Sequence, residues 1–410
     1  MGPGGRIFYY SLKEKIKFDY ILLSEFIFLV LVGIIAQFSA NYPNAIGIFY
    51  KHLLWIAVSL PFFFFAILIS MKLVFNYSLI VYVFSIILLI SVFFFGSSIH
   101  RWIYIGGFQF QPSEFGKIGL IILISRLFSD MKFRKMGSKE VLAPIVVSLL
   151  PIALVLLEPD FGTSILYIII ALGLLWATPI SGLHFLIFIS PILGMFASFH
   201  IISWVIFFLL LLLALYFSRI KFKDSLIIVF INFFVGAFTP LIWNFLQPYQ
   251  KARVFAFLNP YRDPTGVGWH IIQSKITIGS GGFIGKGFLH GSLKSLGFIP
   301  MKNTDFIFSV IAEEFGFVGS LLLIIGYILF LYRILYISNR ARGKFLRYLG
   351  YGIFFYFFSQ FTINIGMAMG ILPVVGIPLP FLTYGGSSLL VSFIFVGLLF
   401  NINISNYEYI

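Results

Sequence analysis

The sequence predicts an all-α integral membrane protein, a polytopic helical bundle with one large loop outside the membrane. Three features predict this class: the composition, the spacing of the apolar runs and the sidedness of the basic residues. Of the 410 residues, 60% are hydrophobic and only 10% are charged, and the mean hydropathy is +1.04. A soluble domain carries about 25% charged residues. This much apolar surface requires a bilayer, in which helices satisfy their own backbone polar groups.

Apolar runs long enough to cross a bilayer recur along the whole chain, since one crossing takes about 20 residues. The twelve candidate spans are 19–40, 51–70, 77–97, 113–129, 141–157, 161–178, 183–199, 201–218, 224–246, 306–332, 348–370 and 385–403. Only a few residues separate 183–199 from 201–218. The sequence leaves open whether this pair forms two full spans. As a pair, it leaves the orientation of every other span unchanged.

The dense clusters of basic residues indicate how the chain is oriented. With the N-terminus in the cytoplasm, all of them fall on the cytoplasmic side, as the positive-inside rule requires. These clusters are 13–17, Lys72, 126–139, 219–223 and 333–347. We therefore expect a cytoplasmic N-terminal segment over residues 1–18, one membrane domain over 19–405, and a cytoplasmic C-terminus. This sidedness accounts for most of the net charge of +14, so nucleic acid is not an expected partner.

A long segment, residues 247–305, is expected outside the membrane and holds most of the basic residues that break the sidedness rule. A loop of this length in a compact protein is usually functional. Within it, residues 269–274 are typical of a short amphipathic helix, and the glycines between 279 and 287 predict turns. We therefore expect the chemistry of the protein to face the outside of the membrane.

The composition also excludes several kinds of site. The chain has no cysteine, which excludes thiol catalysis, disulfides and cysteine-ligated metals. Its six histidines are scattered, and none belongs to a metal-ligand pair such as His-Glu-x-x-His. The sequence therefore predicts no dedicated metal site.

Two motifs in the external segment have two interpretations each. Asp263, followed by Pro264, either begins an Asp-Pro turn or is a catalytic base presented beside cations that hold an anionic substrate. The glycine stretch 279–287 lacks the spacing of a Walker A loop. It forms either tight turns or a nest of backbone amides that binds an anion.

Other ionisable and polar residues stand at the ends of spans. Glu114 and Lys117 are three residues apart, so they share one helix face and form either a structural ion pair or a functional one. Asp160 either caps the helix that follows it or belongs to the site. Asp305 is a candidate cap for the span that begins near Phe306. Residues 384–388 either contact a polar headgroup or only begin the last helix.

Together, and in this order, the motifs resemble the SEDS family (shape, elongation, division and sporulation), which contains RodA, FtsW and SpoVE. The resemblance extends over about residues 19–405. Residues 285–287, 296–300 and 372–378 are closest to the RodA branch of the family. The other matching pieces are 101–102, 110–114, 158–163, 263–264, 270, 273–274, 279–282, 303–308, 313–314 and 379–388.

The resemblance implies a core of roughly ten spans, so residues 183–218 are expected to be an extra helix pair. It also implies a peptidoglycan glycosyltransferase that polymerises lipid II during cell elongation, at the outer face of the bacterial cytoplasmic membrane. The proposed catalytic aspartate of the family corresponds to Asp263. The residues expected to bind substrate are Arg101, Glu114, Lys117, Asp160, Arg253, His270, Gln273, Ser274, Lys286, Asp305, Tyr384, Ser387 and Ser388.

The residue chemistry agrees with an inverting glycosyl transfer. One base suffices to accept the proton of the acceptor hydroxyl, and cations stabilise the departing lipid pyrophosphate. The candidate pyrophosphate partners are Arg101, Lys117, Arg253 and Lys286. We expect no resident cofactor. A divalent cation, Mg²⁺ or Mn²⁺, is an expectation only as a bridge on the pyrophosphate oxygens.

The resemblance implies a partner, a class B penicillin-binding transpeptidase, and other membrane proteins of the elongation complex. Gly366 and Gly370 have the Gly-x-x-x-Gly spacing that lets two membrane helices approach closely. They form either a surface for the span of this partner or a contact inside the bundle. Two alternatives to a polymerase stay open at this point: a lipid II flippase, and a noncatalytic scaffold of a cell-wall synthase.

Overall fold

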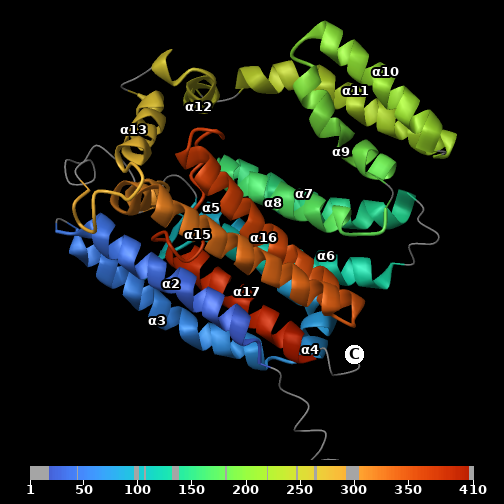
Figure 1. Ribbon diagram of the computed structural model, residues 1–410. Coiled ribbons are helices and arrows are strands. Elements are labelled where there is room, and N and C mark those ends of the chain that lie inside the picture. Colours follow the sequence, from blue (N-terminus) through green and yellow to red (C-terminus); the bar gives the residue numbers. More distant parts are fainter. Residues whose placement is uncertain are drawn as a thin grey trace, which may run out of the picture.

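The computed structural model describes residues 18–43, 45–96, 101–105, 108–131, 138–180, 182–218, 220–245, 248–262, 266–291 and 304–405. The first half of the chain is a run of helices, interrupted once by a two-stranded antiparallel hairpin that the sequence analysis did not predict (Figure 1). Its elements are α2 (Tyr20–Asn41), α3 (Ile46–Leu68), α4 (Met71–Asn76), α5 (Ser78–Phe95), β1 (Ile103–Ile105), β2 (Phe108–Phe110), α6 (Pro112–Asp130), α7 (Ser138–Leu157) and α8 (Phe161–Trp176).

The second half continues with helices and contains the long external segment. Its elements are α9 (Gly182–Ala197), α10 (Ile201–Ser218), α11 (Phe222–Phe245), α12 (Pro248–Leu258), η2 (Pro260–Arg262), α13 (Val267–Ser280), α15 (Ile307–Arg340), α16 (Lys344–Ala368) and α17 (Gly386–Ser405). The amphipathic helix predicted over residues 269–274 is confirmed as part of α13, and the external segment also contains α12.

The polytopic helical class is confirmed, because each of the twelve predicted spans coincides with a helix. Among the described residues, seven helices are long and apolar enough to cross a membrane by length and composition alone. The remaining spans are shorter or carry charges, as α6 does with Glu114 and Lys117. Residues 183–218 form two separate helices, α9 and α10.

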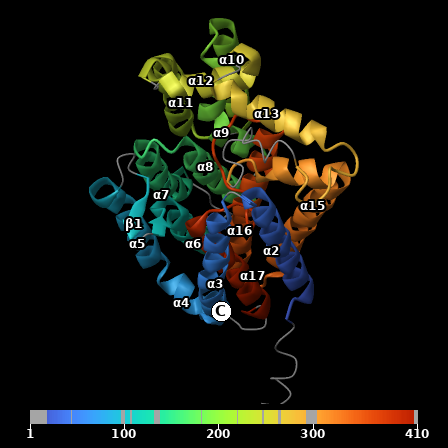
Figure 2. The same ribbon diagram turned by 90° about the vertical axis from the view of Figure 1, so that its left-hand side faces the viewer.

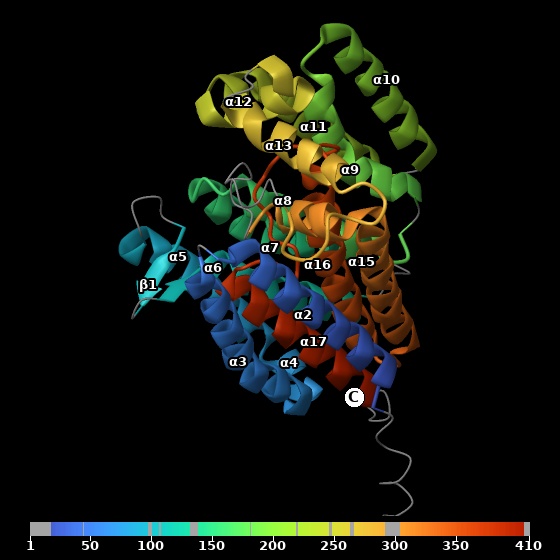
Figure 3. The same cartoon turned by 60° about the vertical axis from the view of Figure 1, so that its left-hand side comes forward.

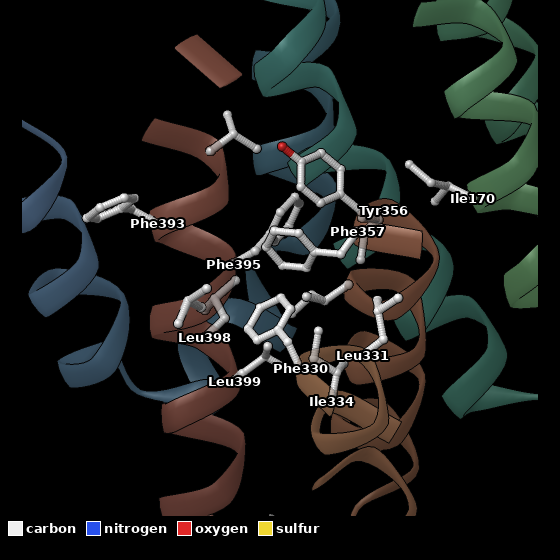
Figure 4. Close-up of a cluster of buried hydrophobic side chains, with 14 of the residues drawn as sticks. Ile170, Phe330, Leu331, Ile334, Tyr356, Phe357, Phe393, Phe395, Leu398 and Leu399 are labelled. Carbon is white, nitrogen blue, oxygen red and sulfur yellow. The ribbon is translucent and has the colours of Figure 1, made fainter. Parts of the chain in front are cut away.

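The main hydrophobic core lies where α15, α16 and α17 meet α2, α3 and α6. Phe330, Phe357 and Leu399 are fully buried there, as expected for a core packed to the density of an organic crystal. Figure 4 shows the hydroxyl of Tyr356 at the edge of this cluster, pointing away from Phe330 and Leu399. Beyond this close-up, the same buried cluster continues to Ile365 of α16 and Leu389 of α17.

Helices α9, α10 and α11 pack mainly on one another and form a small core of their own around Ile187, Leu211 and Leu215. Within this three-helix unit, Asn232 donates to the hydroxyl of Ser190 at 2.9 Å. Figures 2 and 3 show the unit at the end of the molecule near α12 and α13, away from α2, α3 and α17. The predicted extra helix pair is therefore part of this unit, together with α11.

The long helix α15 is broken at Gly316, whose φ of 63° and ψ of −159° lie outside the helical region. The break frees backbone carbonyls that a bilayer cannot solvate. The glycine-rich turn before α15 satisfies them: the amides of Lys286 and Gly287 donate to the carbonyls of Glu313 and Glu314 at 3.0 and 2.9 Å. These two amides are therefore not available to an anion, which contradicts the nest interpretation at these positions.

The same turn also accepts the amides that the break releases on its other side. Phe317 donates to the carbonyl of Gly282 at 2.9 Å, and Val318 donates to the carbonyl of Phe283 at 3.1 Å. Gly285 has a φ of +86°, and a Cβ there would lie 2.1 Å from a backbone oxygen of α15, so no other residue fits. The prediction of tight turns is confirmed within residues 281–287, whereas Gly279 and Ser280 form the end of α13. These turns complete the broken helix α15.

Candidate active site

The turn between α7 and α8 presents Asp160 at the start of α8. The carboxylate of Asp160 accepts a hydrogen bond from the amide of Thr163 at 3.1 Å and another from its hydroxyl at 3.0 Å. The predicted helix cap is therefore confirmed. The amide nitrogen of Gln111, at the end of the β-hairpin, also donates to this carboxylate at 3.1 Å. Asp160 thus joins α8 to the segment that begins α6.

Arg101 holds the same turn from the side of the β-hairpin. Its Nε donates to the carbonyl oxygen of Glu158 at 3.1 Å, and its Nη2 donates to the carbonyl oxygen of Pro159. Both contacts are with the backbone, and no ion pair of Arg101 with a carboxylate is found among the described residues. In this arrangement Arg101 clamps the turn, and its predicted contact with substrate stays a prediction.

The side chain of Glu158 is buried beside this clamp, and neither of its carboxylate oxygens has a hydrogen-bond partner in the part of the chain that the structure describes. Burial raises the pKa of Glu158 to about 8, the nearby Asp160 raises it further, and Arg101 opposes the shift. Glu158 is therefore protonated and neutral at pH 7. The sequence analysis assigned it no role.

Asp305 lies just before α15 and faces the same end of the bundle. Burial raises the pKa of Asp305 to about 6, against the lowering effect of Arg253 and of a hydrogen bond from Thr304, and Asp160 also raises it. The charge of Asp160 therefore acts on Asp305 across the site. The predicted cap is wrong: the N-cap of α15 is Phe306, and no side chain caps that helix.

Helix α13 packs on α15 and places His270 at the site, and α12 carries Arg253 beside it. The ring of His270 stacks on Phe306, with 6.1 Å between the ring centroids and 8° between the planes. Burial lowers the pKa of His270, and the charge of Arg253 lowers it further. His270 is therefore neutral at pH 7, and Arg253 provides positive charge beside Asp305.

Ser274, one turn after His270 on the same face of α13, fixes this helix to the bundle. The hydroxyl of Ser274 lies 2.7 Å from that of Ser309 on α15 and donates to the carbonyl of Ala368 on α16 at 2.5 Å. Gln273, next to it, is also buried. Ser274 therefore positions α13, and substrate contact by Gln273 and Ser274 stays a prediction.

Glu114 and Lys117 form a buried ion pair on α6. The ammonium of Lys117 lies 2.7 Å from a carboxylate oxygen of Glu114, and the Lys117 side chain is fully buried. The predicted pairing is confirmed. Because the ammonium is enclosed, it cannot touch a pyrophosphate directly in this arrangement. The predicted substrate contact of Glu114 and Lys117 stays a prediction.

The start of α17 lies against the start of α6. The backbone amide of Gln111 donates to the hydroxyl of Ser387 at 2.9 Å, and Ser388 interacts with the hydroxyl of Tyr356. Tyr384 is half-buried, and burial raises its pKa. The predicted headgroup contact of these residues stays a prediction.

Lys286 stands apart from the other predicted cations. Its ammonium pairs with the buried carboxylate of Glu313 at 2.7 Å, at the break in α15. The neighbouring Glu314 accepts a hydrogen bond from Ser39 of α2 at 2.5 Å. Lys286 therefore supports the junction of α15 with α2, and its predicted role as a pyrophosphate partner stays a prediction.

Asp263, the predicted catalytic base, lies outside the described residues, as do Pro264 and Thr265. The elements on either side of it, η2 and α13, pack on each other and on α12, which carries Arg253. The elements that flank Asp263 in the sequence therefore lie beside a cluster of four side chains, here called the outer cluster. Its members are Asp160, Asp305, Arg253 and His270.

Sequence reasoning missed three residues of this region, Gln111, Glu158 and Asn364. The amide of Asn364 on α16 donates to the carbonyl of Asp305 at 3.0 Å and to that of Ile377 at 2.7 Å. A signal existed for it, because a polar residue inside an apolar span is a functional candidate by default. Gln111 directly precedes Pro112, the first residue of α6, and no spacing rule distinguished it.

The fold and the outer cluster define a multi-pass helical membrane protein with an acidic and basic site at one end of its bundle. Comparison with known proteins is consistent with this class. The chain belongs to the FtsW/RodA/SpoVE family of cell cycle proteins, whose family model matches residues 18–207 and 201–408. The family resemblance seen in the motifs is thereby confirmed. The two matched segments meet at the start of α10, inside the predicted extra pair.

The curated relatives include two enzymes. The peptidoglycan glycosyltransferase MrdB of Escherichia coli (strain K12) is 39% identical over 326 residues, which are 78% of this chain and 76% of that protein. The peptidoglycan glycosyltransferase RodA of Treponema pallidum (strain Nichols) is 31% identical over 432 residues, covering 94% of this chain and 97% of that protein.

Two solved structures share the fold. One, described as showing structural coordination of polymerization and crosslinking by a peptidoglycan synthase complex, has a TM-score of 0.74 at 25% identity and covers 96% of this chain and 100% of that chain. The rod shape determining protein RodA of Thermus thermophilus has a TM-score of 0.62 at 21% identity, with 96% of this chain and 99% of that chain covered.

Proposed function

We infer that this chain is a peptidoglycan glycosyltransferase that polymerises lipid II into glycan strands at the outer face of the bacterial cytoplasmic membrane during cell elongation. Lipid II is a disaccharide peptide linked to undecaprenyl pyrophosphate. The observation that carries this inference is the match to one family along nearly the whole chain, combined with an outer cluster placed where residues 247–305 meet the bundle. The relatives named as peptidoglycan glycosyltransferases support the same reaction.

The proposed reaction is a single displacement. An acceptor hydroxyl oxygen attacks the anomeric carbon of the donor, the bond from that carbon to the pyrophosphate oxygen breaks, and the lipid pyrophosphate leaves. An α-linked donor then gives a β-linked product, so the reaction inverts the anomeric centre and needs one base. We assign Asp263 as this base: its carboxylate takes the hydroxyl proton. Its place between η2 and α13 supports the assignment.

The leaving pyrophosphate requires positive charge. Arg253 is the best-supported partner, because it lies at the outer cluster beside Asp305 and His270. Among the described residues, no group of three or more His, Asp or Glu side chains could hold a metal ion. We propose a Mg²⁺ or Mn²⁺ ion only as a bridge on the pyrophosphate, whose oxygens suit a hard cation and whose charge the ion would partly neutralise.

A flippase needs a polar route through the bundle, and the packing below the Glu114–Lys117 pair speaks against one. One helical turn further into the membrane, Ile121 of α6 meets Gly352 of α16 so closely that a Cβ on Gly352 would lie 2.5 Å from Ile121 Cγ2. A noncatalytic scaffold is the second alternative. Incubation of the purified protein with labelled lipid II tests both, since only a polymerase makes glycan strands without a partner or a second compartment.

The partner that we propose is a class B penicillin-binding transpeptidase, within a larger set of elongation-complex membrane proteins. The similar chain from a peptidoglycan synthase complex supports a partnership of this kind. The proposed surface at Gly366 and Gly370 is wrong, because both glycines pack inside the protein. A Cβ on Gly366 would lie 2.7 Å from Leu372, and one on Gly370 would lie 2.2 Å from Lys275.

The partner span must therefore bind another face of the bundle. Co-purification of the cognate transpeptidase with this chain in mild detergent tests the partnership itself. We further propose that both termini are cytoplasmic, as the sidedness of the basic residues supports.

A further inference from the structure

Helix α12 lies between the three-helix unit of α9, α10 and α11 and the outer cluster. It carries Arg253, and it packs on α13 and on η2, the short turn that comes directly before Asp263 in the sequence. Figures 1 and 2 show α12 between α11 and α13. The helix has only 11 residues, and isolated helices shorter than about 12–15 residues are marginal. Its position therefore depends on what it packs against.

The two sides of α12 have different surroundings. Lys251 and Phe255 are four residues apart and share one face of the helix. Arg253 is two residues from each of them, which places it on the opposite face. Ala256, on the same side as Arg253, is buried, whereas Phe255 is 43% exposed. Helix α12 therefore turns Arg253 toward the interior and Lys251 and Phe255 away from it.

The face of Lys251 and Phe255 is joined to the end of α11. The ammonium of Lys251 donates to the carbonyl oxygen of Asn244 at 3.1 Å, and a cation is favourable at a helix C-terminus, where the last carbonyls lack partners within the helix. One turn further along α12, the ring of Phe255 meets that of Trp243 edge-on, with 6.0 Å between the centroids and 89° between the planes. Two successive residues of α11 thus hold one face of α12.

Trp243 is supported in turn by the predicted extra helix pair. Phe199, in the short connection between α9 and α10, packs edge-on against Trp243, with 5.5 Å between the centroids and 87° between the planes. Perpendicular contacts at these distances are favoured by the charge distribution of aromatic rings. Phe199, Trp243 and Phe255, here called the aromatic bridge, therefore connect α9 through α11 to α12.

The base of the aromatic bridge is packed independently of α12. The three-helix unit has its own hydrophobic core, and the fully buried Asn232 of α11 donates to the hydroxyl of Ser190 on α9. Separating α9 from α11 would leave this amide without a partner in apolar surroundings, which is costly. The end of α11 that carries Trp243 is therefore held in place by its own unit.

We propose that the three-helix unit fixes the position of α12, and that Trp243 is a positioning residue that holds Arg253 beside Asp305 and His270 through its contact with Phe255. The extra helix pair then contributes to the site although none of its residues belongs to the outer cluster. An anchor in the membrane interface is the alternative role for exposed aromatic rings, and it predicts no effect on α12.

The consequence for the reaction rests on the proposed glycosyltransferase function. Arg253 is the cation assigned to the leaving pyrophosphate, and a misplacement of about 1 Å at a reacting group can lower a rate by about 10²-fold. The aromatic bridge would thus act on the rate through Arg253, without touching the substrate.

The first test measures the position of α12 and does not depend on activity. In this naturally cysteine-free chain, Leu258→Cys on α12 and Ile276→Cys on α13 give two spin-labelling sites, where the native side chains are 71% and 49% exposed. Double electron–electron resonance of the purified protein should give one narrow distance distribution. Trp243→Ala should broaden it at least about twofold, because α12 loses a support. Trp243→Phe, which keeps a ring, should leave it narrow.

The matched control is Phe217→Ala, near the end of α10 and far from Trp243 along the same unit. Phe217 is 65% exposed and contacts Tyr216 edge-on, so its loss should not change the distribution. If Trp243→Ala does not fold, Phe255→Ala removes the same contact from the side of α12. An unchanged distribution in the bridge variant, or equal broadening in Phe217→Ala, would overturn the proposal whether or not the protein is a polymerase.

A second measurement separates positioning from general support of the fold. Trp243→Ala should lower the kcat of lipid II polymerisation about 10–100-fold. In an Arg253→Gln background it should cause no further loss, because Trp243 acts through Arg253. Independent losses that multiply in the double variant would overturn the positioning role. If folded wild-type protein makes no glycan strands, the proposed function fails, and the distance measurement alone decides whether the three-helix unit fixes α12.

Discussion

Arg101 donates its Nε hydrogen to the backbone carbonyl of Glu158 at 3.1 Å, while the carboxyl group of the same Glu158 stays buried without a hydrogen-bond partner among the described residues. A cation and an acid thus meet without forming an ion pair. Burial raises the pKa of Glu158 to about 8 and the nearby Asp160 raises it further, since two carboxylates in a poorly solvated site repel each other, and the neutral form of Glu158 is favoured at pH 7. The turn that places Asp160 in the outer cluster is held by these backbone contacts of Arg101.

The first prediction concerns pH. The pKa of Glu158 is raised from its ordinary value of 4.5 to about 8, so the folded protein binds a proton that the unfolded chain has lost. The contribution of Glu158 to stability is therefore most favourable below pH 4.5 and falls as the pH rises toward 8. Glu158→Gln removes this titration and should raise the thermal midpoint more at pH 8 than at pH 5. A gain of equal size at both pH values would contradict the assigned cause.

The second prediction concerns the contact of Asp19 with Arg333, which joins the start of α2 to α15. Asp19 caps α2 through the amide of Leu22 at 3.0 Å and accepts three hydrogen bonds from the guanidinium of Arg333 on α15. Asp19→Ala loses the cap and the charged bonds together, so it should lower the free energy of unfolding by about 2–4 kcal/mol. Asp130→Ala is the control.

The carboxylate of Asp130 is more than half exposed, and its Oδ2 lies 3.8 Å from Nε of Arg126, which is a weak surface ion pair. Removal of this carboxylate should therefore change the free energy of unfolding by less than about 0.5 kcal/mol. Unfolding in mixed detergent, followed by circular dichroism, measures both variants. Similar losses in Asp19→Ala and Asp130→Ala would show that Asp19 does not hold α2 to α15.

The third prediction concerns the break in α15. At Gly316 the φ is +63°, and a Cβ there would lie 2.3 Å from the amide nitrogen of Gly285. Gly316→Ala should therefore destabilise the protein by at least about 1–3 kcal/mol. Gly47→Ala in α3, where a Cβ meets nothing within 4 Å, should be neutral or stabilising. A thermal midpoint of Gly316→Ala equal to that of Gly47→Ala would disprove the need for glycine.

The sequence predicted most of the fold because hydropathy alone locates helices in a membrane protein. It also predicted the Asp160 cap and the Glu114–Lys117 pair, since both depend on residues three positions apart, whose geometry a helix fixes. Contacts between distant residues were not predictable in this way. The pairing of the glycine turn with the break at Gly316 joins residues about 30 positions apart and leaves no local pattern.

Ambiguous patterns explain the errors. The spacing of Gly366 and Gly370 suits a partner helix as well as an internal contact, and only the packing against Leu372 and Lys275 distinguishes the two. Asp305 precedes a helix as Asp160 does, but the burial and charge around it, and not its position in the sequence, decide what it does.

The fourth prediction concerns topology. Ser292→Cys, within residues 247–305, should react with a membrane-impermeant thiol reagent in intact spheroplasts, because the chain has no other cysteine and this segment is expected outside. Gly343→Cys, between α15 and α16, should react only after the membrane is broken. The opposite pattern would reverse the orientation and place the outer cluster in the cytoplasm.

The central claim is that this chain polymerises lipid II with Asp263 as the base, and polymerisation by the purified protein tests it most directly. Wild-type protein with fluorescently labelled lipid II should yield glycan strands on a gel. Asp263→Asn keeps the shape of the side chain but cannot accept a proton, so the polymerisation rate should fall by about 10²–10⁴-fold. The elution profile of this variant in size-exclusion chromatography should match that of the wild type. Asp130→Asn, at the cytoplasmic end of α6, should keep the wild-type rate. A wild-type rate in Asp263→Asn, or the absence of glycan strands from folded wild-type protein, would contradict the account.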